Sequence, residues 1–384
     1  MNHVRPLLVF GTRPEAIKMA PLIRACRERN SQVEPVVCST GQHREMLEQV
    51  STYFDLRPDV DLHLMQSGQS LMGLTVRCLE GLDTVIASHE PDCVVAQGDT
   101  TTVMAASIAA FYRKIPFVHV EAGLRTGDLQ SPWPEEFNRR VAGLTAALHC
   151  APTQPAANNL LAEGVPPDAI HVTGNTVIDA LLWTVERERA RGAGWTEKYA
   201  SLGDRRLVLV TGHRRENFGG KFEAICRAIA ALARRFGDVA FVYPVHLNPQ
   251  VREPVFRMLG ALPNVQLVEP ASYPEFVWLM DRSTLILTDS GGVQEEAPSL
   301  GKPVLVMRDT TERPEAVAAG AARLVGTDEA VIVRFASELL TDAVQYARHQ
   351  VACNPYGDGR AGQRIANLLA TQAWSGHVRA RVAA

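Results

Sequence analysis

Short apolar runs alternate with longer amphipathic stretches along the first half of the chain. The runs are rich in valine and lie at residues 7–10, 33–38, 93–96 and 117–120. Continuous apolar runs of this length are typical of parallel strands that are buried on both faces. The stretch 15–29 follows Pro14 and has the spacing of an amphipathic helix, since proline suits the first helical turn.

The same pattern restarts at Leu207, and further apolar runs follow at residues 240–243, 265–268, 285–288 and 304–307. Alternating strands and helices predict a parallel sheet with helices on both faces, and 384 residues are long for a single core. We therefore expect an α/β protein with two Rossmann-like, doubly wound parallel-sheet domains. The expected domains are residues 1–175 and 176–360, with the C-terminal helix of 361–384 packed back on the first. The charged stretch 183–202 is interpreted as a solvated helix and connector.

Composition excludes several classes of protein. A net charge of −3 gives no electrostatic footprint for nucleic acid or an anionic membrane. The sequence contains no apolar stretch of membrane-spanning length and no secretory leader pattern, so we expect a cytoplasmic protein. The seven cysteines are scattered without any C-x-x-C pair, which favours buried thiols in a reducing compartment over disulfides or zinc.

Two similar turns follow the first apolar run of each half. Residues 11–15 read Gly-Thr-Arg-Pro-Glu, and residues 212–216 read Gly-His-Arg-Arg-Glu. A glycine and then cations at the start of a helix form an anion-binding arrangement, because helix N-terminal N–H groups and cations converge there. The two turns predict two halves that hold one phosphate-bearing ligand, with His213 as a donor to a leaving phosphate.

A third turn, Asp289-Ser290-Gly291-Gly292, follows the run 285–288 and precedes a helical segment. Its successive backbone N–H groups can contact a diphosphate without obstruction by a Cβ atom, and Glu296, about one turn later, can accept from ribose hydroxyls. An ordinary capped turn is the alternative reading. By contrast, the G-x-G-x-x-G match at 357–362 does not follow a strand pattern, so nicotinamide binding is rejected. No Walker motif and no His/Cys cluster with metal-ligand spacing occurs.

Acidic residues gather in three turns of the first half. Asp99 and Glu121 each follow a buried-type strand, and Glu135 and Glu136 follow a Pro-Trp-Pro segment. Neighbouring parallel strands end at one sheet edge, so Asp99 and Glu121 should project from the same edge. Two carboxylates about 5 Å apart at an effective dielectric constant of about 20 repel by roughly 3 kcal/mol, which would favour one neutral acid. The alternative for each residue alone is a helix cap or a surface acid, and His119 is interpreted as a core histidine.

The combined motifs resemble the non-hydrolysing UDP-N-acetylglucosamine 2-epimerase family. The segments that carry the resemblance span most of the chain in order: residues 10–22, 42–47, 98–102, 119–128, 131–139, 173–181, 211–217, 243–249, 287–316 and 354–359. The resemblance implies a GT-B-type architecture with the active site in the cleft between two Rossmann-like domains, the second of which binds UDP. It also implies reversible epimerisation at carbon 2 of UDP-N-acetylglucosamine to UDP-N-acetylmannosamine for bacterial surface polysaccharide synthesis. The implied route eliminates UDP, leaving 2-acetamidoglucal, and then adds UDP back.

Site roles follow from the same resemblance. Asp99, Glu121, Glu135 and His213 match the catalytic groups. The substrate-binding positions correspond to Arg13, Lys18, Ala271, Phe276, Ser290, Gly291, Gly292, Glu296 and Arg313, of which Ala271 and Phe276 match the uracil pocket. A second, regulatory substrate site corresponds to Gln42, His43, Glu136, Arg214 and His246, although Glu45 and Gly68 stand where some members have Gln and Arg.

The implied partners are UDP-N-acetylglucosamine, UDP-N-acetylmannosamine, UDP and a second copy of the chain in a homodimer; no cofactor, nucleic acid or membrane is expected. Two alternatives stay open at this point. A hydrolysing 2-epimerase would release N-acetylmannosamine and UDP, and a retaining glycosyltransferase of the same fold would need an acceptor.

Overall fold

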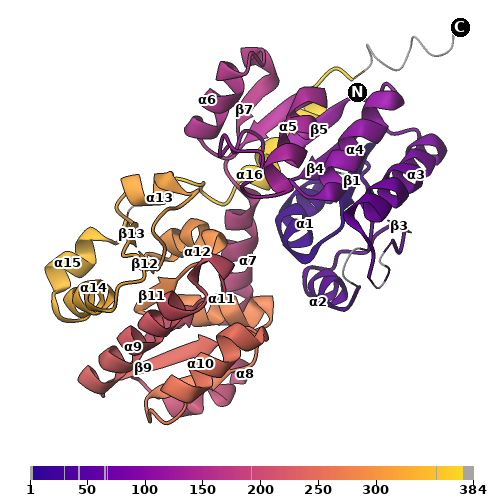
Figure 1. Ribbon diagram of the computed structural model, residues 1–384. Helices are drawn as coiled ribbons and strands as arrows, with labels where there is room; N and C mark the ends of the chain where they lie inside the picture. Colours follow the sequence, from indigo (N-terminus) through magenta and orange to yellow (C-terminus); the bar gives the residue numbers. More distant parts are fainter. Residues whose placement is uncertain are drawn as a thin grey trace, which may run out of the picture. The chain divides into compact units, whose positions relative to one another are not determined.

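The computed structural model describes residues 3–29, 31–41, 44–64, 66, 68–191, 193–351 and 353–374. The chain divides into two compact units. The first comprises residues up to Ala180 and the segment that begins at Tyr356, and the second comprises Leu181–Pro355. Figure 1 shows α16 (Ala361–Thr371), in yellow, among the indigo and magenta elements of the first unit.

The first unit is built on a seven-stranded parallel sheet in the order β3-β2-β1-β4-β5-β6-β7. Its strands are β1 (Pro6–Phe10), β2 (Val36–Ser39), β3 (Val60–Asp61), β4 (Cys93–Gln97), β5 (Phe117–Val120), β6 (Ala146–Ala151) and β7 (Ile170–Val172). Every residue of β1, β2, β4 and β5 is buried, as expected for strands covered on both faces.

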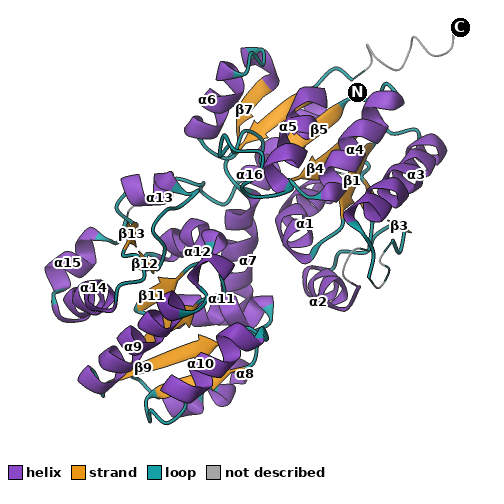
Figure 2. Ribbon diagram, viewed as in Figure 1, coloured by secondary structure: helices purple, strands orange, loops and turns teal. Residues whose placement is uncertain are grey.

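Apart from α16, the helices of this unit alternate with strands along the chain (Figure 2). They are α1 (Arg13–Glu28), α2 (Arg44–Phe54), α3 (Leu71–His89), α4 (Thr101–Tyr112), α5 (Glu135–Thr145), α6 (Gln154–Ala162), the 3₁₀ turn η1 (Pro167–Ala169), α7 (Thr176–Arg191) and α16 (Ala361–Thr371). Helix α7 begins in this unit and continues into the second.

The second unit holds a six-stranded parallel sheet in the order β10-β9-β8-β11-β12-β13. Its strands are β8 (Arg206–Thr211), β9 (Val239–Pro244), β10 (Val265–Val268), β11 (Leu285–Thr288), β12 (Val304–Val306) and β13 (Ala322–Leu324). Its helices are α8 (Ala193–Lys198), α9 (Gly220–Arg235), α10 (Pro249–Leu259), α11 (Tyr273–Arg282), α12 (Gly291–Glu296), α13 (Pro314–Ala318), α14 (Glu329–Thr341) and α15 (Ala343–Arg348), with 3₁₀ turns η2 (Ala200–Leu202), η3 (Arg215–Asn217) and η4 (Ala297–Leu300). The prediction of two doubly wound parallel sheets is therefore confirmed.

Two details differ from the expectation. Strand β2 begins at Val36 instead of residue 33, because Pro35 has no N–H to donate and Val33 makes only an isolated bridge to Val4. The stretch 183–202 is not simply solvated, since Glu188 of α7 is buried and accepts a hydrogen bond from the indole N–H of Trp195 at 2.6 Å. After residue 360 the chain forms α16, which packs on α1: a Cβ at Gly362 would lie 2.9 Å from the carbonyl carbon of Pro21.

Candidate functional site

Three site residues of the first unit lie just after three neighbouring strands. Strand β1 pairs with β4, and β4 pairs with β5, all in parallel. Arg13, Asp99 and Glu121 follow these strands in that order, so they share one edge of the sheet, as the sequence predicts for the two acids. Ligands of open α/β sheets bind at the carboxyl ends of the strands, and β1 and β4 mark the point where the strand order reverses.

Glu121 is the most constrained of the acidic residues. It is buried and has φ of 64°, a left-handed conformation that is uncommon for residues other than glycine and that occurs preferentially at functional sites. Its carboxylate oxygens accept hydrogen bonds from Lys18 Nζ at 2.9 and 2.7 Å. Gln97 Nε2 and Asn175 Nδ2 also donate to this carboxylate. The arrangement holds a charged group in a fixed position at the end of β5.

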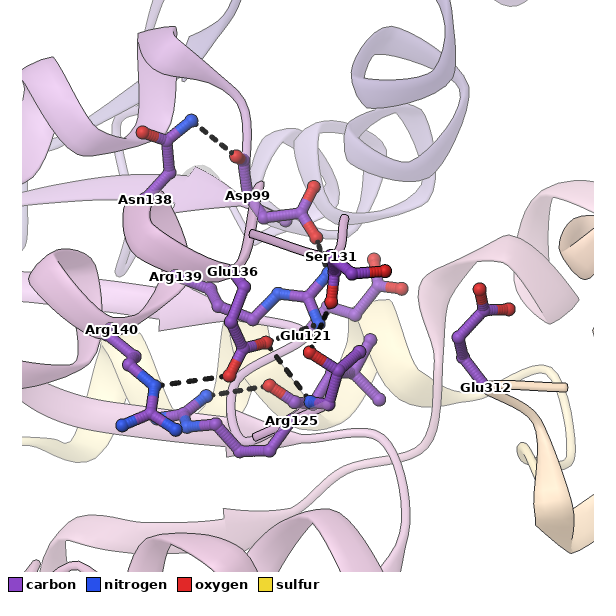
Figure 3. Close-up of polar contacts among 12 residues, drawn as sticks. Asp99, Glu121, Arg125, Ser131, Glu136, Asn138, Arg139, Arg140 and Glu312 are labelled. Carbon is purple, nitrogen blue, oxygen red and sulfur yellow. Dashed lines mark hydrogen bonds and ion pairs between the residues drawn. The ribbon is translucent and has the colours of Figure 1, made fainter. Parts of the chain in front are cut away.

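Asp99 has its own cationic partner (Figure 3). Arg139 of α5 donates to Asp99 Oδ2, and Asn138 Nδ2 donates to the backbone carbonyl of Asp99 at 3.0 Å. Because Arg139 pairs with Asp99 and Lys18 pairs with Glu121, each acid is balanced by a cation. The sequence could not show these two pairs, because Asp99 and Arg139 are 40 positions apart and Lys18 and Glu121 are 103 positions apart.

Glu135 and Glu136 occupy the first turn of α5, where the helix dipole favours negative charge. Glu135 is partly exposed, whereas Glu136 is fully buried. The Glu136 carboxylate accepts from the backbone N–H of Thr126 at 3.1 Å and from Arg139 and Arg140 at 3.2 and 3.1 Å (Figure 3). Glu136 thus ties the 126–127 loop to α5 and to the arginine that contacts Asp99.

Glu15 is a residue of this site that the sequence reasoning did not single out. Its carboxylate accepts from the backbone N–H of Gly11 and Thr12 at 3.0 and 2.7 Å and from Thr100 Oγ1 at 2.5 Å. Burial raises the pKa of Glu15, and these hydrogen bonds oppose the shift. Glu15 joins the turn that carries Arg13 to the turn that carries Asp99. The spacing Thr12-x-x-Glu15 is a capping-box signature, so a signal was present.

The turn after β8 holds His213 of the second unit. Gly212 is needed there because a Cβ would lie 2.9 Å from Tyr243 Oη, which donates to the Gly212 carbonyl at 2.9 Å. The imidazole of His213 stacks on that of His246, with ring centroids 5.4 Å apart and an interplanar angle of 13°. Asp289 accepts from the backbone N–H groups of His213 and Arg214 at 2.9 and 2.8 Å. Desolvation lowers the pKa of His213, while the Asp289 carboxylate acts in the opposite direction.

The Ser290-Gly291-Gly292 turn follows β11, which is the neighbour of β8 in the sheet. A Cβ at Gly291 would lie 3.7 Å from a terminal nitrogen of Arg214, so this cation stands beside the glycine backbone. The structure therefore brings His213, Arg214 and the glycine turn together at one sheet edge. An edge of this kind offers backbone N–H groups and cations to an anion.

The remaining predicted residues of the second unit lie around the same edge. Arg313 donates to Glu295, and Tyr273 donates to Glu296 Oε1 at 3.3 Å. Ala271 and Phe276 lie just before and within the first turn of α11, and both are half-buried. Gln42 and His43 lie outside the described residues.

Within the described ranges, no cluster of three or more His, Cys, Asp or Glu side chains is arranged to hold a metal ion. Among the helices of the same residues, none has the length and apolar character to span a membrane.

Comparisons with known proteins agree with one another over nearly the whole chain. The family model described as UDP-N-acetylglucosamine 2-epimerase matches residues 24–370. The UDP-N-acetylglucosamine 2-epimerase of Escherichia coli (strain K12) is 56% identical over 370 residues, which cover 95% of this chain and 98% of that protein. The enzyme of the same name from Salmonella typhimurium is also 56% identical, with the same coverage.

Solved structures give the same result. The crystal structure of UDP-GlcNAc 2-epimerase from Neisseria meningitidis bound to UDP-GlcNAc superimposes with a TM-score of 0.90 at 48% identity, covering 96% of this chain and all of that one. The Methanocaldococcus jannaschii enzyme in complex with UDP-GlcNAc and UDP gives a TM-score of 0.80 at 33% identity, covering 96% of this chain and 100% of that one. With this identity over almost its full length, the chain belongs to the UDP-N-acetylglucosamine 2-epimerase family.

Proposed function

We propose that this enzyme interconverts UDP-N-acetylglucosamine and UDP-N-acetylmannosamine without hydrolysis, by eliminating UDP and adding it back. The observation that carries the proposal is the pair of acids at one sheet edge, Asp99 and Glu121, each held by its own cation. The Neisseria enzyme, which shares this fold, binds UDP-GlcNAc. The proposed substrate partners of this chain are therefore the two UDP-sugars and UDP.

The chemistry requires two changes at neighbouring carbons. The bond between carbon 1 and the diphosphate oxygen breaks, and UDP leaves with the electron pair. A carboxylate removes the proton from carbon 2, and the carbon–hydrogen electrons form the double bond of 2-acetamidoglucal. UDP then adds back to carbon 1 while a proton is delivered to the opposite face of carbon 2. The net reaction neither consumes water nor changes oxidation state.

The two units are proposed to serve different parts of the substrate. Asp99, Glu121 and Glu135 of the first unit are the proposed acid/base and cation-stabilising groups, and a positioned carboxylate contributes typically about 10²–10⁴-fold to such proton transfers. In the second unit, His213 and the backbone N–H groups of Ser290–Gly292 are the proposed diphosphate contacts, because charge-assisted donors bind phosphate strongly. The further proposed contacts with UDP or the sugar are Arg13, Lys18, Ala271, Phe276, Glu296 and Arg313.

Lys18 and Arg313 have carboxylate partners in the structure, Glu121 and Glu295 respectively. A phosphate contact by either residue would therefore compete with an ion pair that is already formed. A second, activating substrate site at Gln42, His43, Glu136, Arg214 and His246 is part of the same proposal. Because Glu136 is committed to the 126–127 loop and to two arginines, its part in such a site would be to hold that loop.

We also propose a homodimer in the cytoplasm. The first unit has a surface cavity of about 480 Å³ that is lined mainly by apolar residues of α3, α4, α5 and the loop before α5, including Leu71, Met104 and Phe137. Met72 and Trp133 of its lining are 72% and 63% exposed. Exposed apolar patches often mark protein interfaces. A monomer by light scattering at micromolar concentration would refute the dimer.

Incubation with UDP-N-acetylglucosamine alone tests the reaction. We expect UDP-N-acetylmannosamine as the only new sugar nucleotide, with the total UDP-sugar conserved. Stoichiometric release of free N-acetylmannosamine and UDP would support the hydrolysing alternative. Turnover that appears only when a sugar acceptor is added would support a glycosyltransferase.

A further inference from the structure

Asp289 contacts His213 in two different ways. It is the first residue after β11 and is completely buried. Its Oδ2 atom accepts from the backbone N–H of His213 at 2.9 Å and of Arg214 at 2.8 Å, and from Asn217 Nδ2 at 3.4 Å. Its Oδ1 atom is buried, accepts no hydrogen bond from any described residue, and lies 3.7 Å from Nδ1 of the His213 ring.

A buried carboxylate oxygen without a donor is costly, so its orientation needs an explanation. The two backbone contacts already hold the turn through Oδ2, and they leave Oδ1 directed at the imidazole. The opposite side of that turn is also fixed, because Asn217 donates to the carbonyl of Met307 at 3.1 Å. Stacking on His246 limits the rotation of the His213 ring. A small approach would convert the 3.7 Å separation into a hydrogen bond from Nδ1–H to Oδ1.

We propose that Asp289 is a positioning residue for His213: it holds the proton on Nδ1 and favours the imidazolium form, which leaves Nε2–H as the donor to the departing diphosphate. This role rests on the proposed function of His213 as a diphosphate contact. In proteins, the atom that one ring nitrogen of histidine contacts commonly determines what the other nitrogen does. A carboxylate that accepts from Nδ1–H also stabilises an imidazolium when it forms.

The other groups that face His213 act against protonation. Burial of the His213 ring lowers its pKa most, and electrostatic interaction with His246 and Arg214 lowers it further. Asp289 is the carboxylate that opposes these effects. Removal of its charge should therefore lower the pKa of His213 still more, while the backbone contacts to the turn can be retained.

Asp289→Asn removes the charge and retains the backbone contacts. Its amide oxygen can still accept from the two backbone N–H groups, while its NH₂ group replaces Oδ1. We expect the pKa of His213, followed by NMR of its ring protons, to fall by about one unit. UDP affinity, measured by calorimetry, should fall up to about tenfold above both pKa values. The difference should vanish at a pH below both, where His213 is protonated in either protein. Wild type and variant are compared at each pH, so ionisation of UDP itself cancels.

Asp309→Asn is the matched control, since Asp309 is an exposed acid of the same unit that pairs with Lys221 at 2.9 Å. Asp309→Asn should change neither the pKa of His213 nor the affinity for UDP. An unchanged His213 pKa in a folded Asp289→Asn variant would overturn the proposal.

A measurement on the unmodified enzyme covers the case in which Asp289→Asn does not fold. The ¹⁵N shifts of neutral His213, assigned by their loss in His213→Gln, should show the proton on Nδ1; a proton on Nε2 would overturn the proposal. If the wild type fails to bind UDP, the proposed function fails instead, and the two failures are thereby distinguished.

Discussion

The ion pair between Lys18 and Glu121 gives the sharpest test of how the acidic site is held together. The side chains are 18% and 4% exposed, and Nζ contacts both carboxylate oxygens at 2.9 and 2.7 Å. Removing one partner of a buried pair costs about 3–5 kcal/mol, because the remaining charge stays buried without its counterion. Gln97 and Asn175 still donate to Glu121 in the variant, so the lower end of this range applies.

We therefore expect Lys18→Met to lower the stability of the first unit by about 3 kcal/mol, or its Tm by roughly 6–12 °C for a unit of this size. Scanning calorimetry measures the shift. Adding Glu121→Gln to this variant removes the buried charge and should restore about 2 kcal/mol of the loss.

Lys221→Met is the control, because Lys221 and Asp309 are 53% and 66% exposed and such pairs contribute at most about 1 kcal/mol. A Lys18→Met variant that loses no more than this control, with no recovery in the double variant, would refute the view that Lys18 neutralises a buried carboxylate.

Three further predictions concern activity and pH. Asp99→Asn, Glu121→Gln and Glu135→Gln should each lower kcat by about 10²-fold or more in steady-state assays, as expected for acid/base or electrostatic groups; near-wild-type turnover in all three would show that the site lies elsewhere. Burial lowers the pKa of His119 and His149 to about 4 each, so the unfolded chain binds more protons between pH 6.5 and 4. Stability of the first unit should be complete above pH 6.5 and fall through this window by at most about 3 kcal/mol per histidine; urea unfolding at several pH values checks this, and an unchanged slope in His149→Leu would contradict it. Activity should persist in EDTA, and a loss that a divalent metal restores would contradict the reaction proposed.

Strands that a local run of apolar residues marks were predictable from the sequence. Strand β5 was expected at residues 117–120 and is found there, and three apolar runs of the second unit match β9, β10 and β11 within one residue at each end. Strands β3, β6, β7 and β13 were not expected. Strands β3, β7 and β13 are only two or three residues long, so no period can be seen in them, and their neighbours in the sheet define them. Strand β6 (Ala146–Ala151) is six residues long, but it holds three alanines and no β-branched residue, so its sequence does not favour a strand.

Contacts between residues far apart in the chain could not be predicted from the local sequence. The resemblance assigned Lys18 to substrate binding, yet the folded chain pairs it with Glu121, and nothing in the local sequence of either residue specifies that pair. The left-handed conformation of Glu121 is equally hidden, because a glutamate does not signal a positive φ as a glycine does. Asp289 was noticed only as part of a glycine turn, and its approach to His213 depends on the pairing of β8 with β11.

The proposed elimination route is tested most directly by hydrogen exchange at carbon 2. UDP-N-acetylglucosamine is incubated with the enzyme alone in deuterium oxide, and the product is followed by proton NMR at its anomeric and carbon-2 positions. A carboxylate that removes the proton and exchanges with solvent predicts UDP-N-acetylmannosamine with deuterium at carbon 2. Product that retains hydrogen at carbon 2 at full conversion would contradict the route.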